Sequence, residues 1–260
     1  MSKKKSLAQR ADPHDLYQRS VQSAEFEIDF FHRVFKKQRG RKALSLREDF
    51  CGTALLSSAW VASDKLRTAT GVDLDQQVLD WAAQHNIAPL GEAGERIKLL
   101  QSDVRSKRRA RFDVINAMNF SYWIFRTRTE LRSYFAAVRS ALVTDGVFFL
   151  DLYGGWEAQE PMCEPRKIKG GFTYEWEQAS FCPITHEVVN HIHFEFKDGS
   201  RLDKAFTYEW RFWTLPEIQE LLREAGFSEV IVHWEKNDKY RPASRAENQP
   251  GWLAFLAALK

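Results

Sequence analysis

The chain has 260 residues, of which 44% are hydrophobic and 28% charged, with a formal net charge of +3. These values are typical of one α/β domain with an insertion or of two small domains, and they exclude disordered and fibrous proteins. The longest apolar stretch near either end, residues 252–259, is too short to cross a bilayer, so neither a membrane span nor secretion is indicated. Three widely spaced cysteines without a C-x-x-C pattern predict neither a disulfide framework nor a zinc site, and we expect a cytoplasmic protein.

Positive charge is concentrated at the N-terminus. Residues 1–42 contain 11 Lys and Arg against 5 Asp and Glu, whereas residues 43–260 contain 27 against 30. A basic arm can contact nucleic acid, but short basic termini are more often solvated, and we favour that interpretation. The second basic run, residues 105–111, is likewise interpreted as a solvated loop.

The first expected element is a helix over residues 15–39. Phe26, Phe30 and Val34 recur at four-residue spacing and give it a broad apolar face. This helix should therefore pack on, or fold over, another layer.

Short apolar runs then alternate with helical periods from residue 43 to residue 151. The expected strands are 43–46, 68–72, 97–100, 112–116 and 147–151, and the expected helices are 53–62, 75–86 and 129–142, the last with Thr129 as its N-cap. Strands and helices in this alternation predict a parallel sheet with helices on both faces.

After Gly154 and Gly155 the hydrophobic period changes to two. The expected antiparallel strands are 172–176, 191–196 and 202–210, with Asp198-Gly199 as a two-residue turn between the last two. A helix follows, with a capping box at Thr214 and Glu217 and Gly226 at its end, and residues 229–234 and 252–258 are expected as the final strands.

Acidic residues follow three successive strands of the predicted parallel sheet, where ligands bind in open α/β folds. Around Gly52, the turn after the first strand can bring backbone N–H groups close to a ligand, or it can simply be a tight turn. Asp73, about 20 residues on, can accept ribose hydroxyls, whereas Asp75 is better suited to cap the next helix. Asp103 can accept from an adenine amino group.

These residues together resemble the class I S-adenosylmethionine (SAM)-dependent methyltransferases. The sequence LREDFCGTA, residues 46–54, occupies the place of that family's glycine-rich motif and is similar to a variant of bacterial members, with Phe50 and Ala54 where glycines are usual. The resemblance implies a Rossmann-like, seven-stranded, mostly parallel sheet whose last strand is antiparallel. It further implies an N-terminal helical lid (1–42), a SAM-binding core (43–153), an antiparallel β insertion after strand five that forms a substrate wall (154–213), and a C-terminal helix and strands that complete the core (214–260).

The resemblance also implies SAM as cofactor and S-adenosylhomocysteine (SAH) as product. Glu48 would lie near the cofactor's amino group, Gly52 under its methionine moiety, Asp73 at the ribose, and Asp103 with the Val104 backbone at the adenine. The residues expected to contact the cofactor are Gln22, Glu48, Phe50, Cys51, Gly52, Thr53, Asp73, Leu74, Asp103, Val104, Asn116 and Ala117.

Methyl transfer from a sulfonium needs in-line alignment and exclusion of water, and a general base only if the acceptor loses a proton as it attacks. Tyr17, Tyr122 and His191 are the catalytic candidates, although the alternation around His191 and His193 favours an exposed strand face for both. No Cys, Asp or Glu spacing supports metal ligation by these histidines. The many aromatic residues near the expected site could enclose a flat or cationic substrate.

The favoured function is methylation of an N or O atom of a small molecule. The alternatives are an RNA or protein methyltransferase that uses the basic arm, and a non-catalytic SAM-binding or partner-binding module. An NAD-dependent oxidoreductase is disfavoured because the G-x-G-x-x-G spacing is missing. We expect a small-molecule partner, no membrane, and a monomer or homodimer; nucleic acid is a disfavoured partner that the sequence does not exclude.

Overall fold

The computed structural model describes residues 5–107, 109–236 and 239–260, and it contains two β-sheets. The larger sheet has eight strands in the order β11-β10-β12-β5-β4-β1-β2-β3. Its strands are β1 (Ser45–Asp49), β2 (Thr68–Asp73), β3 (Ile97–Gln101), β4 (Phe112–Ala117), β5 (Leu142–Gly154), β10 (Glu229–Glu235), β11 (Tyr240–Pro242) and β12 (Trp252–Leu259). Strands β1 to β5 are parallel, and β12 is antiparallel to both β5 and β10. The predicted Rossmann-like sheet is confirmed, with one more strand than expected because β11 is a three-residue edge strand.

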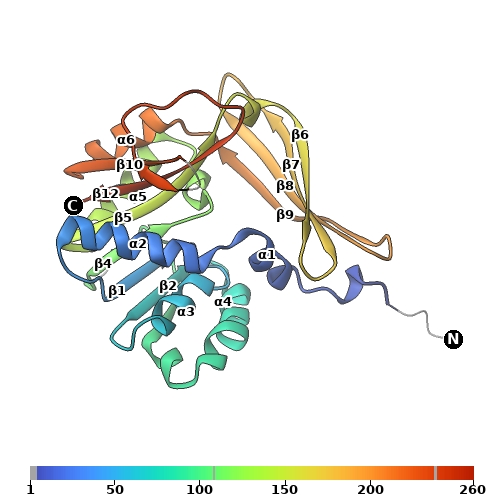
Figure 1. Cartoon of the computed structure of the whole chain (residues 1–260), viewed down its shortest axis with the longest axis horizontal. Helices are drawn as coiled ribbons and strands as arrows, with labels where there is room; N and C mark the ends of the chain where they lie inside the picture. The colour runs from blue at the N-terminus through green and yellow to red at the C-terminus, as the bar shows by residue number, and fades with distance from the viewer. Residues whose placement is uncertain (1–4, 108, 237–238) are drawn as a thin grey trace.

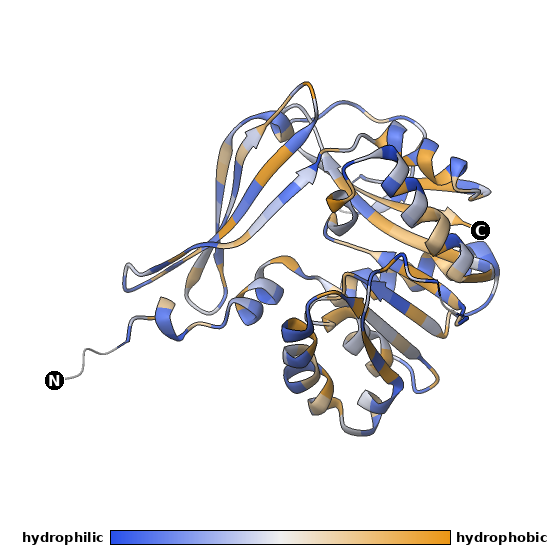
Figure 2. Ribbon diagram, turned by 180° about the vertical axis from the view of Figure 1, so that it is seen from behind, coloured by the Kyte–Doolittle hydropathy of each residue, from blue (hydrophilic) through white to orange (hydrophobic). Residues whose placement is uncertain are grey.

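Helices cover both faces of the large sheet (Figure 1). The helices of the described residues are α1 (Pro13–Val21), α2 (Ala24–Arg39), α3 (Leu55–Ala62), α4 (Gln76–Ala82), α5 (Arg128–Ala141) and α6 (Leu215–Glu224), with short 3-10 helices η1 (Ala8–Arg10), η3 (Ala88–Arg96), η4 (Ser121–Ile124) and η5 (Glu157–Gln159) and a π-helical turn η2 (Ala83–Ile87). Figure 2 shows hydrophobic residues along the strands that these helices cover.

The two apolar cores lie on opposite faces of this sheet. On one face Phe31 of α2 stacks on Phe149 of β5, with ring centroids 4.5 Å apart. On the other face Phe135 of α5 packs on Phe148, the next residue of β5, at 5.9 Å. Neighbouring strand residues thus serve opposite layers, as the pleat requires.

Two helix predictions need correction. The expected helix 15–39 is two helices, because Gln22 has extended backbone angles between α1 and α2. The N-cap of α5 is Thr127 and not Thr129. Thr127 Oγ1 accepts a hydrogen bond from the Glu130 backbone N–H, and the Glu130 carboxylate accepts one from the Thr127 backbone N–H. That capping box begins the helix two residues earlier.

The second sheet lies between β5 and α6 along the chain, and Figure 1 shows it to one side of the large sheet, with α1 between the two. Its antiparallel strands are β6 (Met162–Ile168), β7 (Phe172–Phe181), β8 (Glu187–Phe196) and β9 (Arg201–Arg211), paired in that order. Strand β6 was not predicted. The turn between β8 and β9 also differs from the prediction: Phe196 N donates to Ser200 O at 2.9 Å, so three residues form the loop and Gly199 takes the left-handed position.

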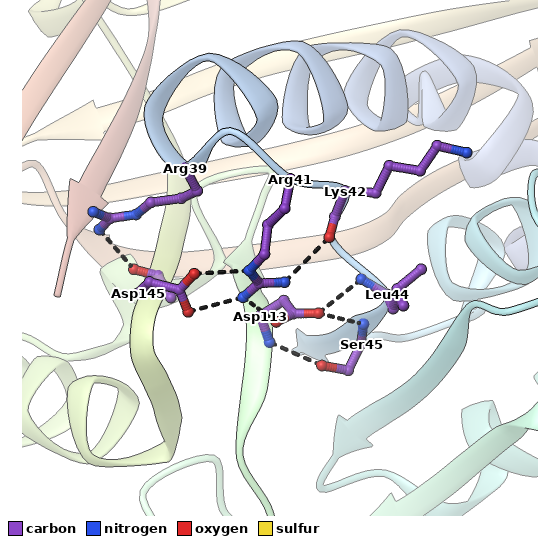
Figure 3. A network of polar contacts seen from close by, with 8 residues as sticks. Arg39, Arg41, Lys42, Leu44, Ser45, Asp113 and Asp145 are labelled. Carbon is purple, nitrogen blue, oxygen red and sulfur yellow. Dashed lines mark hydrogen bonds and ion pairs between the residues drawn. The ribbon is translucent and has the colours of Figure 1, made fainter.

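Arg41 fixes the connection from α2 to β1 (Figure 3). Its guanidinium donates to Asp113 at the start of β4, at 2.7 Å, and to Asp145 of β5, at 2.8 Å from two nitrogens. Asp113 in turn accepts from the backbone N–H groups of Leu44 and Ser45. The contact with Arg41 lowers the pKa of Asp145.

Among the described residues, no helix is long and apolar enough to span a membrane.

Candidate functional site

Three adjoining cavities lie over the carboxyl ends of β1 to β5. The central cavity, of about 360 Å³, lies between the ends of β1, β2 and β4 and the segment that joins α1 to α2. The side cavity, of about 240 Å³, adjoins it past Phe50 and Asp73 and reaches the end of β3. The chamber, of about 430 Å³, lies between the ends of β4 and β5 and the inner face of the second sheet.

The turn after β1 forms the floor of the central cavity. Phe50, Gly52 and Ala54 all have left-handed backbone angles, with φ between 49° and 56°. For Phe50 and Ala54 this conformation is costly, which is a physical reason for glycine at such positions. Gly52 N donates to Asp73 Oδ2 at 2.8 Å, so the end of β2 holds this turn, and a Cβ on Gly52 would meet no atom within 4 Å.

Glu48 joins the end of β1 to the first turn of α3. Its Oε2 accepts from the N–H of Ser57 at 2.9 Å and from the Ser57 hydroxyl at 2.5 Å. Burial raises the pKa of Glu48 to about 7 despite these two donors. The carboxyl also lines the central cavity, where it can face a ligand.

Asp75 caps the next helix as the sequence predicts, and Asp73 lies at the cavities. Asp75 accepts from the N–H of Gln77 and caps α4. Asp73 lines both the central and the side cavity, and its two oxygens accept from Gly52 N and Asp75 N. Each carboxylate oxygen keeps a further lone pair for a ligand hydroxyl.

Asp103, Val104 and Leu74 line the side cavity. Asp103 forms an ion pair with Arg105 at 2.6 Å, and these hydrogen bonds lower the pKa of Asp103. Arg105 belongs to the basic run 105–111, whose Arg108 lies outside the described residues, as do residues 1–4 of the basic arm.

Most of the other residues expected at the cofactor line the central cavity. Gln22 Oε1 accepts from the Thr53 hydroxyl at 3.0 Å, which brings the break between the first two helices onto the turn after β1. Asn116 lines the same cavity. The Cys51 side chain packs behind the turn, since a Cβ on Gly71 would lie 2.8 Å from its sulfur. Ala117 is fully buried and lines none of the three cavities, so the structure does not bring it to the site.

Of the three catalytic candidates, the structure brings only Tyr17 to the site. Tyr17 lines both the central cavity and the chamber, and its hydroxyl interacts with that of Tyr208. Burial raises the pKa of Tyr17, so its hydroxyl keeps its proton.

The other two candidates need correction. Tyr122 is completely buried below the chamber, and its hydroxyl donates to the backbone oxygen of Asp151 at 2.8 Å. His191 lies on the face of β8 opposite Ile192, which lines the chamber, and its Nδ1 contacts the Thr207 hydroxyl at 2.9 Å. The predicted exposed face is also wrong: His191 and His193 are 6% and 5% exposed because neighbouring side chains cover them.

Two buried acids were missed in the sequence: Glu27, which lines the central cavity, and Asp151, which lines none of the three cavities. Asp151 at the end of β5 accepts from the N–H groups of Asn119 and Phe120, each at 3.0 Å, and so holds the left-handed turn after β4. Burial raises its pKa to about 7. The strand-end rule that selected Asp73 would also have found Asp151. Glu27 of α2 is buried beside the central cavity, and its position between Phe26 and Ile28 in the apolar run was the available signal.

Aromatic side chains dominate the chamber. Phe120 packs on Tyr153 with ring centroids 4.8 Å apart, and Tyr208 stacks on Trp210 at 4.4 Å. The chamber's polar side chains are Asn119, Glu157, Glu164, Arg166 and Gln178. No cluster of His, Cys, Asp and Glu among the described residues could hold a metal ion.

No protein-family model matches the sequence, and comparison with curated proteins gives no match. Solved structures do match. An S-adenosylmethionine-dependent methyltransferase from Clostridium acetobutylicum is 18% identical with a TM-score of 0.70, over 93% of this chain and 96% of that one. The fold is that of the class I SAM-dependent methyltransferases.

Two further structures of this fold carry more specific descriptions. An amino pentose methyltransferase from Micromonospora echinaspora, solved with SAM bound, is 15% identical with a TM-score of 0.69, over 94% of this chain and 95% of that one. A sugar N-methyltransferase from Streptoalloteichus is 17% identical with a TM-score of 0.66, over all of this chain and 97% of that one. Each match spans both sheets of the present methyltransferase fold.

Proposed function

We propose that the protein is a SAM-dependent methyltransferase that moves a methyl group from SAM to an N or O atom of a small molecule by direct in-line transfer. One observation carries this proposal: the central cavity and the chamber share Tyr17, Asn119, Tyr208 and Trp210. A sulfonium methyl at that junction would face an acceptor in the chamber.

The residues around the two cofactor-side cavities fit SAM. The free lone pairs of Asp73 suit the ribose hydroxyls, and Asp103 with the Val104 backbone suits the adenine at the side cavity. Gly52, Thr53 and Gln22 would surround the methionine moiety. SAH is then the product that leaves this site.

When bound, SAM supplies the electrophilic methyl group on a positive sulfur, so the chain's own residues need to position and shield the acceptor. The segment 1–42 would act as a lid and the insertion 154–213 as the wall of the acceptor site. Tyr17 would orient the acceptor through a hydroxyl that stays protonated, and not as a base.

The size and lining of the chamber favour a small acceptor. About 430 Å³ is within the range of small-molecule sites. Aromatic faces, with the two carboxylates Glu157 and Glu164 against the one guanidinium of Arg166, would suit an amine that carries positive charge. We prefer nitrogen as the acceptor atom, a preference supported by the amino pentose and sugar N-methyltransferases that share the fold. All three cysteines are free thiols, in keeping with the cytoplasmic location that we expect.

Transfer of labelled methyl groups tests the proposal. The protein is incubated with methyl-labelled SAM and a panel of amino sugars, other amines and hydroxyl compounds, and both labelled product and SAH are measured. Replacing the chamber residue Trp176 by alanine should lower kcat/KM at least about tenfold, since the acceptor loses an aromatic face.

Trp156→Ala is the matched control, because Trp156 is 52% exposed and lies outside the chamber. It should leave kcat/KM within about twofold. Transfer of label only to RNA or protein, with a steep loss at raised salt, would contradict the small-molecule proposal.

A further inference from the structure

Glu27 is a buried acid that the proposed transfer does not yet use. It lies on α2, is 7% exposed, and lines the central cavity. Its backbone N–H donates to Ser23 O, but its carboxyl makes no hydrogen bond to any other described residue. Its carboxyl oxygens open to the central cavity, where a ligand can supply the hydrogen bonds that the chain does not.

The charges around Glu27 indicate the sign of that ligand. Glu48 of β1 and Asp151 of β5 are both buried and interact electrostatically with Glu27. Tyr17 of α1 is a third titratable group that interacts with Glu27 in this way. No Lys or Arg is among the described residues that line the central cavity. Glu27 and Glu48 in the lining, with Asp151 acting on Glu27 from outside it and no Lys or Arg in the described lining, leave this part of the cavity suited to a positive group.

Glu27 is the acid best placed to receive that group. Two donors from Ser57 occupy Glu48 Oε2, and the N–H groups of Asn119 and Phe120 occupy Asp151. Both oxygens of Glu27 are free for hydrogen bonds to a ligand. The methionine ammonium group of SAM has three N–H donors and a full charge.

We propose that the Glu27 carboxylate binds the ammonium group of the cofactor's methionine moiety, so that α2 contributes directly to the cofactor site. This inference rests on the proposed function. It adds to the acids at the strand ends a cofactor contact made by a helix. Desolvation by burial, reinforced by Asp151 and Glu48, raises the pKa of Glu27 to about 8 in the absence of ligand. Binding therefore converts a neutral carboxyl to a carboxylate, and its proton passes to the buffer.

The test compares wild type with Glu27→Gln, which keeps the shape of the neutral carboxyl. SAH and 5′-methylthioadenosine are titrated calorimetrically at pH 7 in phosphate and in Tris, whose ionisation enthalpies differ. Glu27→Gln should weaken SAH binding at least about tenfold and release fewer protons than wild type. It should change the affinity for 5′-methylthioadenosine, which lacks the ammonium group, by no more than about twofold.

The pH dependence gives a second readout. The ligand needs Glu27 as an anion, so the wild-type affinity relative to that of Glu27→Gln should rise between pH 6.5 and pH 8 and level off above it, by about tenfold per pH unit at most. Taking the ratio of the two proteins cancels the titration of the ligand itself. Glu25→Gln is the matched control: Glu25 is exposed in the same helical turn, and its substitution should leave every value unchanged.

The possible failures are distinguishable. Equal SAH affinity and equal proton release in wild type and Glu27→Gln would overturn the ammonium contact and leave the methyltransferase proposal standing. An equal loss of SAH and 5′-methylthioadenosine would also overturn it, because the effect would then be on the shape of the cavity. Folded wild type that binds neither SAM nor SAH would overturn both proposals.

Discussion

Arg47 is the buried cation that connects the first strand to the loop after the third. Its guanidinium donates to Asp49 at 2.6 and 3.0 Å and to the backbone oxygen of Val104 at 2.5 Å, and Tyr134 donates to the same carboxylate at 2.9 Å. The Arg47 and Asp49 side chains are 3% and 0% exposed. A buried ion pair adds little net stability but is costly to break from one side. We therefore assign Arg47 a positioning role, since it fixes Val104 at the edge of the proposed adenine site.

Replacing Arg47 by methionine should lower the free energy of unfolding by about 3 to 5 kcal/mol, because Asp49 would remain buried without its cation. The double variant Arg47→Met/Asp49→Asn should recover part of that loss. Urea unfolding followed by circular dichroism measures both. A loss below about 1 kcal/mol in the single variant would show that the pair does not hold this part of the chain.

At the scale of elements, hydrophobic periodicity was sufficient to predict a strand or helix where that segment packs on or within the large sheet. The strands of that sheet other than β11, and the helices α5 and α6, were predicted because buried faces leave a regular apolar pattern. Strand β6 left none, since residues 163–167 are exposed and include Pro165. The break at Gln22 was also hidden, because the apolar pattern continues across it and its contact with Thr53 is tertiary.

The residues of the candidate site likewise fall into those that the sequence could place and those that it could not. The sequence predicted that Glu48, Asp73 and Asp103 lie close together because the ends of parallel strands share one edge of the sheet, and the structure places them at two adjoining cavities. Tyr122 and His191 were misjudged because the sequence does not specify which neighbours cover a side chain. Tyr122 lies in a 3-10 turn with its ring in the core, and His191 is on the side of β8 away from the chamber.

Gly155 allows the end of β5 to pass under the segment before β12. Its φ is +116°, and a Cβ there would lie 2.1 Å from the backbone oxygen of Pro250. Gly155→Ala should therefore destabilise the protein by at least about 1 kcal/mol in urea unfolding.

Gly251→Ala provides the comparison, because Gly251 has no left-handed φ and a Cβ on it would meet no atom within 4 Å. It should change the free energy of unfolding by less than about 0.5 kcal/mol, or stabilise slightly. Equal effects of the two substitutions would mean that the close approach at Gly155 does not constrain this connection.

At the scale of the whole molecule, α1 connects the second sheet to the core of the large sheet. Arg19 donates to the Lys169 backbone oxygen at 2.8 Å on the side of the second sheet. On the other side, Trp81 of α4 donates to Asp12 at 2.6 Å, and the Asn86 amide donates to Gln18 at 3.0 Å. Figure 1 shows α1 between the two sheets. Tyr17 of this helix borders both the central cavity and the chamber. Cofactor and acceptor would meet under α1, shielded from water on that side.

Calorimetric titration with SAM and SAH of wild type, Asp73→Ala and Asp80→Ala tests the central claim most directly. Asp80 is an exposed acid of α4 and serves as the control for loss of a charge. The account predicts that wild type and Asp80→Ala bind both ligands, and that folded Asp73→Ala binds them at least about tenfold more weakly for lack of the ribose contact. Well-folded wild type that binds neither ligand would contradict the account.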